Sequence, residues 1–226
     1  MSKRWLSERR REYYHRRAKE EGYASRAAFK LIQIDERFGF LKEARRVLDL
    51  GSAPGGWLQV VSEVIGDDGM VLGVDLVKIR DMGLPGVDTL IGDITTEDTI
   101  QEIREFFHGR VEVILSDMSP DVSGNWDMDQ FRQIHLARIT LVVADELLRQ
   151  DGWLVVKTFQ GLEHEKYVHE VRAMFEKVEI VKPKASRKQS AEIYLVAHRL
   201  KTPRQLPEEY RPEEEEDASS PAPSEP

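Results

Sequence analysis

A lysine directly follows an apolar run in the stretch VVKTFQG, residues 155–161. Val155 and Val156 are typical of the end of a buried strand, and Lys157 comes next. Most lysines stay exposed because burying an ammonium group is costly, so Lys157 could simply extend into water. A lysine held at a buried strand end can instead lose its proton and act as a base. The neighbouring side chains decide between these two possibilities.

Acidic residues stand at the ends of other predicted strands. The carboxyl ends of parallel strands meet at one edge of a sheet, where ligands bind. Each acid alone could equally be a helix cap or a loop residue, but four acids and a lysine at one edge favour a site. The expected edge residues are Asp49 or Gly51, Asp75, Asp93, Asp117 and Lys157.

A glycine-rich turn, GSAPGGW at residues 51–57, follows the first predicted strand. Such a turn lets the backbone approach a nucleotide, and the helix that follows offers free N–H groups. Its spacing is not GxGxxG, which weakens the case for a dinucleotide. Asp75 suits the hydroxyls of a ribose, and Asp93 could accept a hydrogen bond from an adenine amino group. A bound adenosine explains all three features together.

Strands alternate with helices along most of the chain. This order predicts an α/β fold with a parallel, doubly wound sheet whose strands are covered on both faces. The last two strands are too close for a crossover helix and should pair as an antiparallel hairpin at the sheet edge. Ser25 should cap a helix over 25–38, with Lys30 beside its apolar face. The predicted strands are 45–51, 70–76, 88–94, 111–118, 152–159, 177–183 and 192–200, and the later helices are 57–66, 97–108, 128–149 and 163–175.

Charge is unevenly distributed along the 226 residues. The net charge is −8, yet residues 1–30 carry ten Lys/Arg against four Glu, and residues 207–226 carry eight acids against one Arg. We expect a basic N-terminal helical segment (1–40), a catalytic domain (41–202) and an acidic disordered tail (203–226). No apolar run approaches the roughly 20 residues that cross a bilayer, and the N-terminus lacks the apolar core of a signal peptide, so we expect a cytoplasmic protein. No long apolar patch demands a dimer, so we expect a monomer.

Several chemistries are excluded or disfavoured by the residues present. The chain has no cysteine, which excludes disulfides, thiolate metal sites and the thiolate attack that methylates C5 of pyrimidines. SDMSP at 116–120 lacks the Asn/Asp-Pro-Pro-aromatic pattern of amino-group methylation. In HEKYVHE (164–170), His164 and His169 are five apart and share no helix face, so we predict exposed helix polarity and no metal. A nucleotide site with a lysine base and no metal fits transfer to a hydroxyl.

Together these motifs resemble the FtsJ/RrmJ (RlmE) family of S-adenosylmethionine-dependent ribosomal RNA 2′-O-ribose methyltransferases. The resemblance covers about residues 4–200. It rests on RWL (4–6), YASRAAFKL (23–31), LDLGSAPGGW (48–57), SDMSPDVSG (116–124), VVKTFQG (155–161) and SRKQSAEIYLVA (186–197).

The resemblance implies a Rossmann-like, seven-stranded class I methyltransferase sheet with its last strand antiparallel and helices on both faces. It implies a uridine in the A-loop of large-subunit ribosomal RNA as the target, with Lys157 as general base. The catalytic set that it implies is Lys30, Asp117, Lys157 and Glu192. The residues that it and the glycine turn suggest for S-adenosylmethionine are Gly51, Gly55, Gly56, Trp57, Asp75, Asp93 and Asp117.

RNA should contact the basic N-terminus, including Arg9, Arg10 and Arg11, and the stretch KPKASRK (182–188). Base stacking or helix packing could occupy Tyr13, Tyr14 and Tyr23. A tRNA anticodon-loop 2′-O-methyltransferase and a non-catalytic ribosome-assembly factor remain alternatives. A NAD-dependent dehydrogenase would need GxGxxG and would leave Lys157 and Glu192 without a role.

Overall fold

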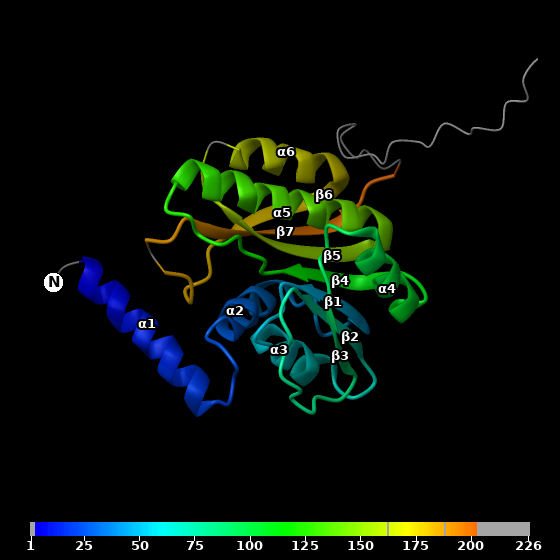
Figure 1. Cartoon of the computed structure of the whole chain (residues 1–226), viewed down its shortest axis with the longest axis horizontal. Helices are drawn as coiled ribbons and strands as arrows, with labels where there is room; N and C mark the ends of the chain where they lie inside the picture. The colour runs from blue at the N-terminus through cyan, green and yellow to red at the C-terminus, as the bar shows by residue number, and fades with distance from the viewer. Residues whose placement is uncertain (1–2, 162, 188, 203–226) are drawn as a thin grey trace, which may run out of the picture.

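The apolar runs form one seven-stranded sheet with strand order β3-β2-β1-β4-β5-β7-β6 (Figure 1). The computed structural model describes residues 3–161, 163–187 and 189–202, with side chains from residue 12 onward. The strands are β1 (Arg46–Leu50), β2 (Met70–Asp75), β3 (Val87–Ile91), β4 (Val111–Ser116), β5 (Leu148–Phe159), β6 (Phe175–Val181) and β7 (Glu192–Leu200).

Strand directions confirm the predicted fold class. The strands β1 to β5 pair in parallel, and β7 runs antiparallel to both β5 and β6. The first strand lies inside the sheet with β2 on one side and β4 on the other. Chain order reverses at this point, which is where open α/β sheets bind ligands beyond the carboxyl ends of their strands.

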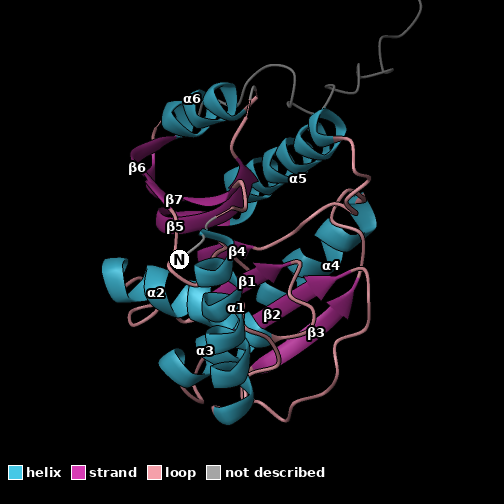
Figure 2. Cartoon of the chain, turned by 90° about the vertical axis from the view of Figure 1, so that its left-hand side faces the viewer, coloured by secondary structure: helices cyan, strands magenta, loops and turns pink. Residues whose placement is uncertain are grey.

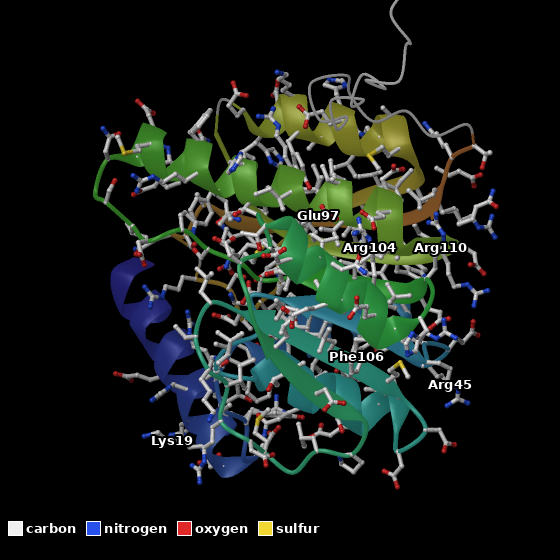
Figure 3. All side chains as sticks on the ribbon, turned by 45° about the vertical axis from the view of Figure 1, so that its right-hand side comes forward. Lys19, Arg45, Glu97, Arg104, Phe106 and Arg110 are labelled. Carbon is white, nitrogen blue, oxygen red and sulfur yellow. The ribbon has the colours of Figure 1, made fainter. Side chains whose placement is uncertain are left out.

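Helices cover both faces of the sheet (Figure 2). The helices α2 (Ala28–Phe38) and α3 (Gly56–Ile65) lie on one face. The opposite face carries α4 (Glu97–Phe107), α5 (Trp126–Leu147) and α6 (His164–Met174). On that side Arg104 pairs with Glu97 of its own helix and with Glu146 of α5 (Figure 3). Apolar residues of each layer pack on the sheet and form two separate cores, because the inner strands, such as β1, β2 and β4, are buried on both sides.

The first helix, α1 (Lys3–Glu20), lies outside these layers and packs on α2. Tyr14 and Ala18 of α1 contact Phe29 of α2 and Ala185 of the β6–β7 connection. This small apolar cluster attaches the basic N-terminal segment beside the edge of the sheet where the β5 and β7 ends meet.

The predicted start of α2 is wrong. The helix begins at Ala28, and Ala27 occupies the N-cap position without a side-chain cap. Ser25 Oγ accepts a hydrogen bond from the Ala27 N–H at 3.2 Å, and the Ser25 carbonyl accepts one from the Ala28 N–H at 3.3 Å. Ser25 therefore stabilises a turn before the helix, because its side chain reaches a backbone donor only two residues away.

Strand β3 differs from the prediction that the strands are covered on both faces. Asp88, Thr89 and Ile91 are exposed. The strand lies at the sheet edge, and residues 76–86, which lead into it from β2, form no helix that could cover it. The short apolar run in 88–94 is therefore not evidence of burial on both sides.

Helix α6 also differs from its predicted exposed polarity. His164 and Glu170 are both buried. Glu170 accepts two hydrogen bonds from Arg138, at 2.7 and 3.0 Å, and burial lowers the pKa of His164. The described ranges contain no group of three His, Cys, Asp or Glu that could hold a metal ion. Across the same ranges, no helix is both long and apolar enough to cross a membrane.

Candidate active site

Lys157 is buried near the carboxyl end of β5, with 6% of its side chain exposed. Its Nζ lies 3.1 Å from Asp117 Oδ1 and also donates a hydrogen bond to the Asp117 carbonyl oxygen. Asp117 directly follows β4, the parallel neighbour of β5, so the adjacent strand ends bring the two side chains together. Lys157 therefore does not extend into water.

Lys30 reaches the same cluster from α2. Its side chain is 8% exposed, so it belongs to the buried side of the helix and not to its margin. Its Nζ lies 2.9 Å from Glu192 Oε2 and 3.7 Å from Asp117 Oδ2. The four residues predicted to be catalytic, which are spread over more than 160 positions, thus form one contiguous group.

Tyr194 completes this cluster, although the sequence analysis did not identify it. Its buried hydroxyl donates to Asp117 Oδ1 at 2.6 Å and accepts from Lys30 Nζ at 3.1 Å. Side chains alternate along a strand, so Tyr194 shares a face of β7 with Glu192, two residues earlier. That spacing was the available signal for including Tyr194.

The charges in the cluster are mutually stabilised. Burial alone would raise the pKa of Asp117, but the charges on Lys157 and Lys30 and the hydrogen bond from Tyr194 hold it below its ordinary value. Burial, together with the negative charges of Asp117 and Glu192, raises the pKa of the Tyr194 hydroxyl. Asp117 is therefore an ionised acceptor, and Tyr194 is a neutral donor to it.

Two further hydrogen-bonded side chains hold the cluster in place. Gln133 of α5 donates from Nε2 to the carbonyl oxygens of Lys157, at 2.9 Å, and Met118, at 3.2 Å. It therefore ties the ends of β4 and β5 together from the α5 side. Ser186 Oγ donates to Glu192 Oε1 at 2.7 Å, which leaves Oε2 directed at Lys30.

A cavity of about 370 Å³ lies beside the cluster, beyond the ends of β1, β2 and β4. This volume falls in the range of small-molecule sites. Gly51, Asp75, Asp93 and Asp117 line it, as the sequence predicted for a cofactor. The rest of its lining is mostly apolar, namely Leu50, Ala53, Val74, Leu76, Val77, Gly92, Ile94, Met118, Ser119 and Leu136.

Gly55, Gly56 and Trp57 are not part of that lining. The indole Nε1 of Trp57 donates to the Ala27 carbonyl at 2.8 Å, and its ring packs against Tyr194. The structure therefore gives the Trp57 side chain a role in joining α3 to α2. Gly56 lies against Ser25, and Gly55 lies against Met82.

The acids of the cavity suit S-adenosylmethionine by their chemistry. Asp75 accepts hydrogen bonds from the Ala53 N–H at 2.9 Å and the Val77 N–H at 3.1 Å, yet a carboxylate has about four acceptor sites and retains capacity for ribose hydroxyls. Hydrogen bonds from the backbone and side chain of Thr95 hold the pKa of Asp93 below its usual range. Ionised carboxylates around an apolar cavity fit a cationic sulfonium that carries a nucleoside.

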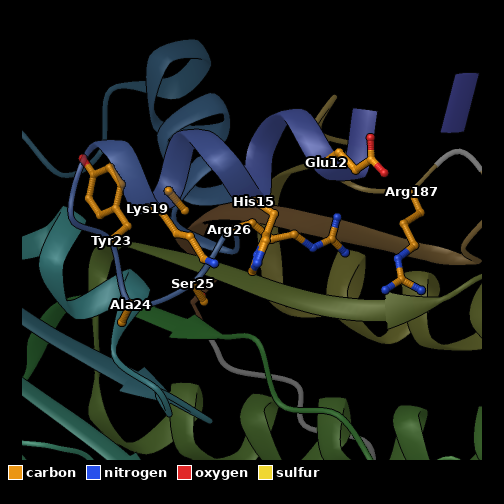
Figure 4. Close-up of a pocket in the computed structure, with 9 residues that line it drawn as sticks. Glu12, His15, Lys19, Tyr23, Ala24, Ser25, Arg26 and Arg187 are labelled. Carbon is orange, nitrogen blue, oxygen red and sulfur yellow. The ribbon is translucent and has the colours of Figure 1, made fainter. Parts of the chain in front are cut away.

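A second, basic hollow of about 550 Å³ lies between α1 and the β6–β7 connection (Figure 4). His15 and Lys19 of α1 line it, together with Arg26 and the exposed Arg187. The hollow joins the two segments predicted to contact RNA. The side chains of Arg9, Arg10 and Arg11 lie outside the described part of the chain.

The three tyrosines of this region have different surroundings. Tyr14 is buried against Phe29 and accepts a hydrogen bond from Gln33, so it serves helix packing. Tyr23 is partly buried and donates to Glu63 at 2.7 Å. Tyr13 is exposed and contacts the Tyr14 ring edge to face.

Comparison with known proteins identifies the family of the chain. Residues 23–200 match the FtsJ-like methyltransferase family. "Ribosomal RNA large subunit methyltransferase E" of Methanocaldococcus jannaschii is 45% identical over 200 residues, covering 87% of this chain and 82% of that protein. The protein of the same name from Methanothrix thermoacetophila is 46% identical over 190 residues, covering 84% and 73% of the two chains.

A solved structure is similar as well. A crystal structure from Plasmodium falciparum that carries the name of a ribosomal RNA methyltransferase superimposes with a TM-score of 0.70 at 27% identity. The match covers 79% of this chain and 98% of that one. The overall fold is thus similar to that of a protein of related sequence.

Proposed function

The chain belongs to the FtsJ-like methyltransferase family, and from this we propose that it methylates the ribose 2′-hydroxyl of a nucleotide in large-subunit ribosomal RNA. S-adenosylmethionine is the proposed methyl donor, and a uridine of the A-loop is the proposed target. The names of the relatives support the RNA class, and the cavity acids support the donor. The donor supplies, when bound, an electrophilic methyl group on a positively charged sulfur.

One observation carries the proposal. Lys157 is buried at the boundary of the cofactor-sized cavity, because it contacts Asp117, which also lines that cavity. A hydroxyl held at this boundary would lie beside both a methyl donor and a proton acceptor. Methylation of a hydroxyl requires both groups in one place.

Lys157 is proposed to take the 2′-hydroxyl proton at Nζ. Only the neutral amine can do so, and the charges around it determine when that form is present. Two ammonium groups and two carboxylates, those of Lys30, Lys157, Asp117 and Glu192, give the cluster a net charge of zero when all four are ionised. The positive sulfonium of S-adenosylmethionine would add one charge to this balanced set. It would disfavour one of the two ammonium groups and therefore favour the neutral form of a lysine.

The other residues of the cluster position Lys157 and the hydroxyl. Asp117 accepts from Lys157 and from Tyr194, which fixes the direction of the Lys157 amine. Lys30, held by Glu192, adds a positive charge that stabilises negative charge developing on the ribose oxygen. The basic hollow supplies affinity through the phosphates, and the 2′-hydroxyl itself distinguishes RNA from DNA.

The test uses purified protein, labelled S-adenosylmethionine and unmodified large ribosomal subunits, with naked ribosomal RNA and tRNA in parallel. We expect label in the large-subunit RNA, mapped to one nucleotide whose phosphodiester resists alkali, since a blocked 2′-hydroxyl prevents cleavage. Label in tRNA alone would assign the protein to anticodon-loop methylation. The absence of label from every RNA, with cofactor still bound, would favour the assembly factor.

The same assay tests the proposed base. We expect Lys157→Met to lower the methylation rate by about 10²- to 10⁴-fold, the usual contribution of a general base, with cofactor affinity retained. Lys42→Met, which removes an exposed lysine after α2, is the matched control and should behave as the wild type. Normal methylation by a folded Lys157→Met variant would contradict the assignment.

A further inference from the structure

Two stacked aromatic rings, those of Trp126 and Phe159, lie next to the catalytic cluster, and the proposed methyl transfer does not use them. Trp126 is the first residue of α5 and is 49% exposed. Its ring stacks on Phe159, the last residue of β5, with centroids 5.9 Å apart and planes inclined by 19°. The exposed face of this stacked pair offers a flat apolar surface on which a further ring could stack.

Strand geometry places Phe159 next to the reacting groups. Side chains two residues apart on a strand share a face, so Phe159 lies on the same face of β5 as Lys157. In the β5–β7 register, Phe159 pairs directly with Glu192, just as Lys157 pairs with Tyr194. Phe159 therefore follows Lys157 along the same face of β5, toward the end of the strand, and the Trp126 ring stacks on it.

A hollow of about 420 Å³ brings the Phe159 ring of this pair together with positive charge. Its lining contains Phe159 and Glu192, and also Arg26 and Arg187, the two arginines of the basic hollow. The remaining lining residues are polar, namely Ser119, Gln189 and Ser190. Aromatic surface, guanidinium groups and hydrogen-bonding side chains thus meet within one hollow.

We propose that Trp126 and Phe159 form a stacking subsite for an unpaired nucleobase of the RNA, next to the ribose that is methylated. This inference rests on the proposed function. A nucleotide strand has flat bases and anionic phosphates, and it matches in both respects a stacked ring pair whose Phe159 shares a hollow with Arg26 and Arg187. An apolar protein segment would match the rings but not the two arginines.

The local structure holds the Trp126 ring in position. Asn125 caps α5, since its Oδ1 accepts from the Met128 N–H at 3.3 Å. The buried carboxylate of Asp129 accepts from the Ser123 N–H at 2.8 Å and from Ser123 Oγ at 2.7 Å. The segment before α5 is thus fixed to the helix, so stacking a base on Trp126 requires little reordering.

The test measures binding without methylation. Wild-type protein is titrated with a single-stranded oligouridylate, and with the same oligomer carrying one abasic ribose, while tryptophan fluorescence is recorded. We expect quenching by the intact oligomer in the wild type and not in Trp126→Phe, which removes the indole yet retains a ring and most of the affinity. Trp126→Ala and Phe159→Ala should each lose about tenfold in affinity, within the range of stacking on one base.

Phe131→Ala is the matched control, because Phe131 is an exposed aromatic of α5, 62% exposed, and among the described residues it is Trp126, not Phe131, that stacks on Phe159. It should bind as the wild type does, and the abasic oligomer should bind the wild type and Trp126→Ala equally. Equal affinity of Trp126→Ala and Phe131→Ala for the intact oligomer would overturn the subsite, as would no binding of the oligomer by the wild type.

The result separates the subsite from the proposed function. Base-dependent quenching without methylation of any RNA would retain the subsite and reject the methyltransfer proposal. If Trp126→Ala instead methylates ribosomal RNA with the wild-type kcat/KM, the methyltransfer proposal is retained and the subsite is rejected. Docking of a protein on the two rings would leave the oligomer titration unchanged by Trp126→Ala, and so would also reject the subsite.

Discussion

In the proposed active site, the charged side chains form ion pairs mainly with one another. Asp117 accepts from Lys157 and Tyr194 and lies near Lys30, so its carboxylate is the common partner of the cluster. Replacing it would leave two ammonium groups without that partner in a buried place, which is costly. The cluster therefore behaves as a unit, and single substitutions within it should not be additive.

Asp49 is a buried acid of another kind. It lies in β1 with 0% exposure, and neither carboxylate oxygen has a hydrogen-bond partner among the described residues. Burial, and then the negative charges of Asp117 and Asp75, raise its pKa well above the ordinary value. Asp49 thus carries its proton in the folded protein at pH values where the unfolded chain has lost it. Its stabilising effect is complete below the unfolded-state pKa and declines as the pH rises toward the folded-state pKa.

We expect Asp49→Asn to change the pH dependence of stability. The free energy of unfolding of the variant should rise relative to the wild type by about 1.4 kcal/mol per pH unit, from about pH 5 up to the folded-state pKa, since one proton difference is removed. Urea unfolding at pH 5, 6, 7 and 8 measures this. Asp88→Asn, on exposed β3, is the control. Its free energy of unfolding should change with pH in the same way as that of the wild type. Parallel curves for Asp49→Asn would show that Asp49 is ionised in the folded state.

At the scale of elements, the turn after β1 depends on a glycine at position 51. Gly51 has φ of 73°, a left-handed conformation that glycine adopts without strain. A Cβ there would lie 2.8 Å from the Met118 N and Cα atoms, in the segment that follows β4. Gly51 therefore allows the β1 turn to approach the residues after Asp117, and this approach forms one wall of the cavity proposed for the cofactor.

We expect Gly51→Ala to lower the free energy of unfolding by about 2–4 kcal/mol, through the left-handed backbone and the clash with the Met118 backbone, and to weaken S-adenosylmethionine binding. Gly39→Ala is the matched control, since Gly39 has φ of 70° with no atom within 4 Å of the added Cβ. It should lose about 1–2 kcal/mol and retain cofactor affinity. Denaturant unfolding and calorimetric titration measure both effects. Equal losses in the two variants would show that the contact with Met118 is unimportant.

At the scale of the whole molecule, the positive charge near the site contrasts with a net charge of −8. A negative protein as a whole repels RNA, so the proposed affinity for RNA would have to come from local contacts such as Arg26 and Arg187 in the hollow beside α1. The acidic residues 207–226 lie outside the described residues. Their eight acids could occupy the basic segment in place of RNA, and unchanged RNA affinity after deletion of these residues would reject this role.

We expect RNA affinity to fall with salt, and Arg26→Gln and Arg187→Gln each to reduce the slope of log K against log salt by about 0.7, the value for one phosphate contact on a single strand. Filter binding from 50 to 400 mM salt, on the order of the physiological range, measures the slope. Arg45→Gln is the control. Arg45 is exposed just before the amino end of β1, away from the carboxyl strand ends that carry the proposed site (Figure 3). An unchanged slope in both hollow variants would place the RNA elsewhere.

The sequence by itself determined the fold class and most of the site. Strand and helix periods are local properties, and the rule that parallel strands end at one edge placed Asp117 beside Lys157 before any coordinates. The likeness to known motifs added Lys30 and Glu192, which periodicity alone would have left as a helix lysine and an edge-strand acid. The start of α2 at Ser25 was wrong because a serine can bond its own turn as readily as a helix.

Only the tertiary structure decided how distant segments meet. It placed the Tyr194 hydroxyl between Lys30 and Asp117, and it gave the Trp57 indole to α2 and not to the cofactor cavity. It also stacked Trp126 on Phe159, 33 positions later. These contacts depend on how a helix or strand docks on others far along the chain, and such docking is set by the packing of the whole core and not by local sequence.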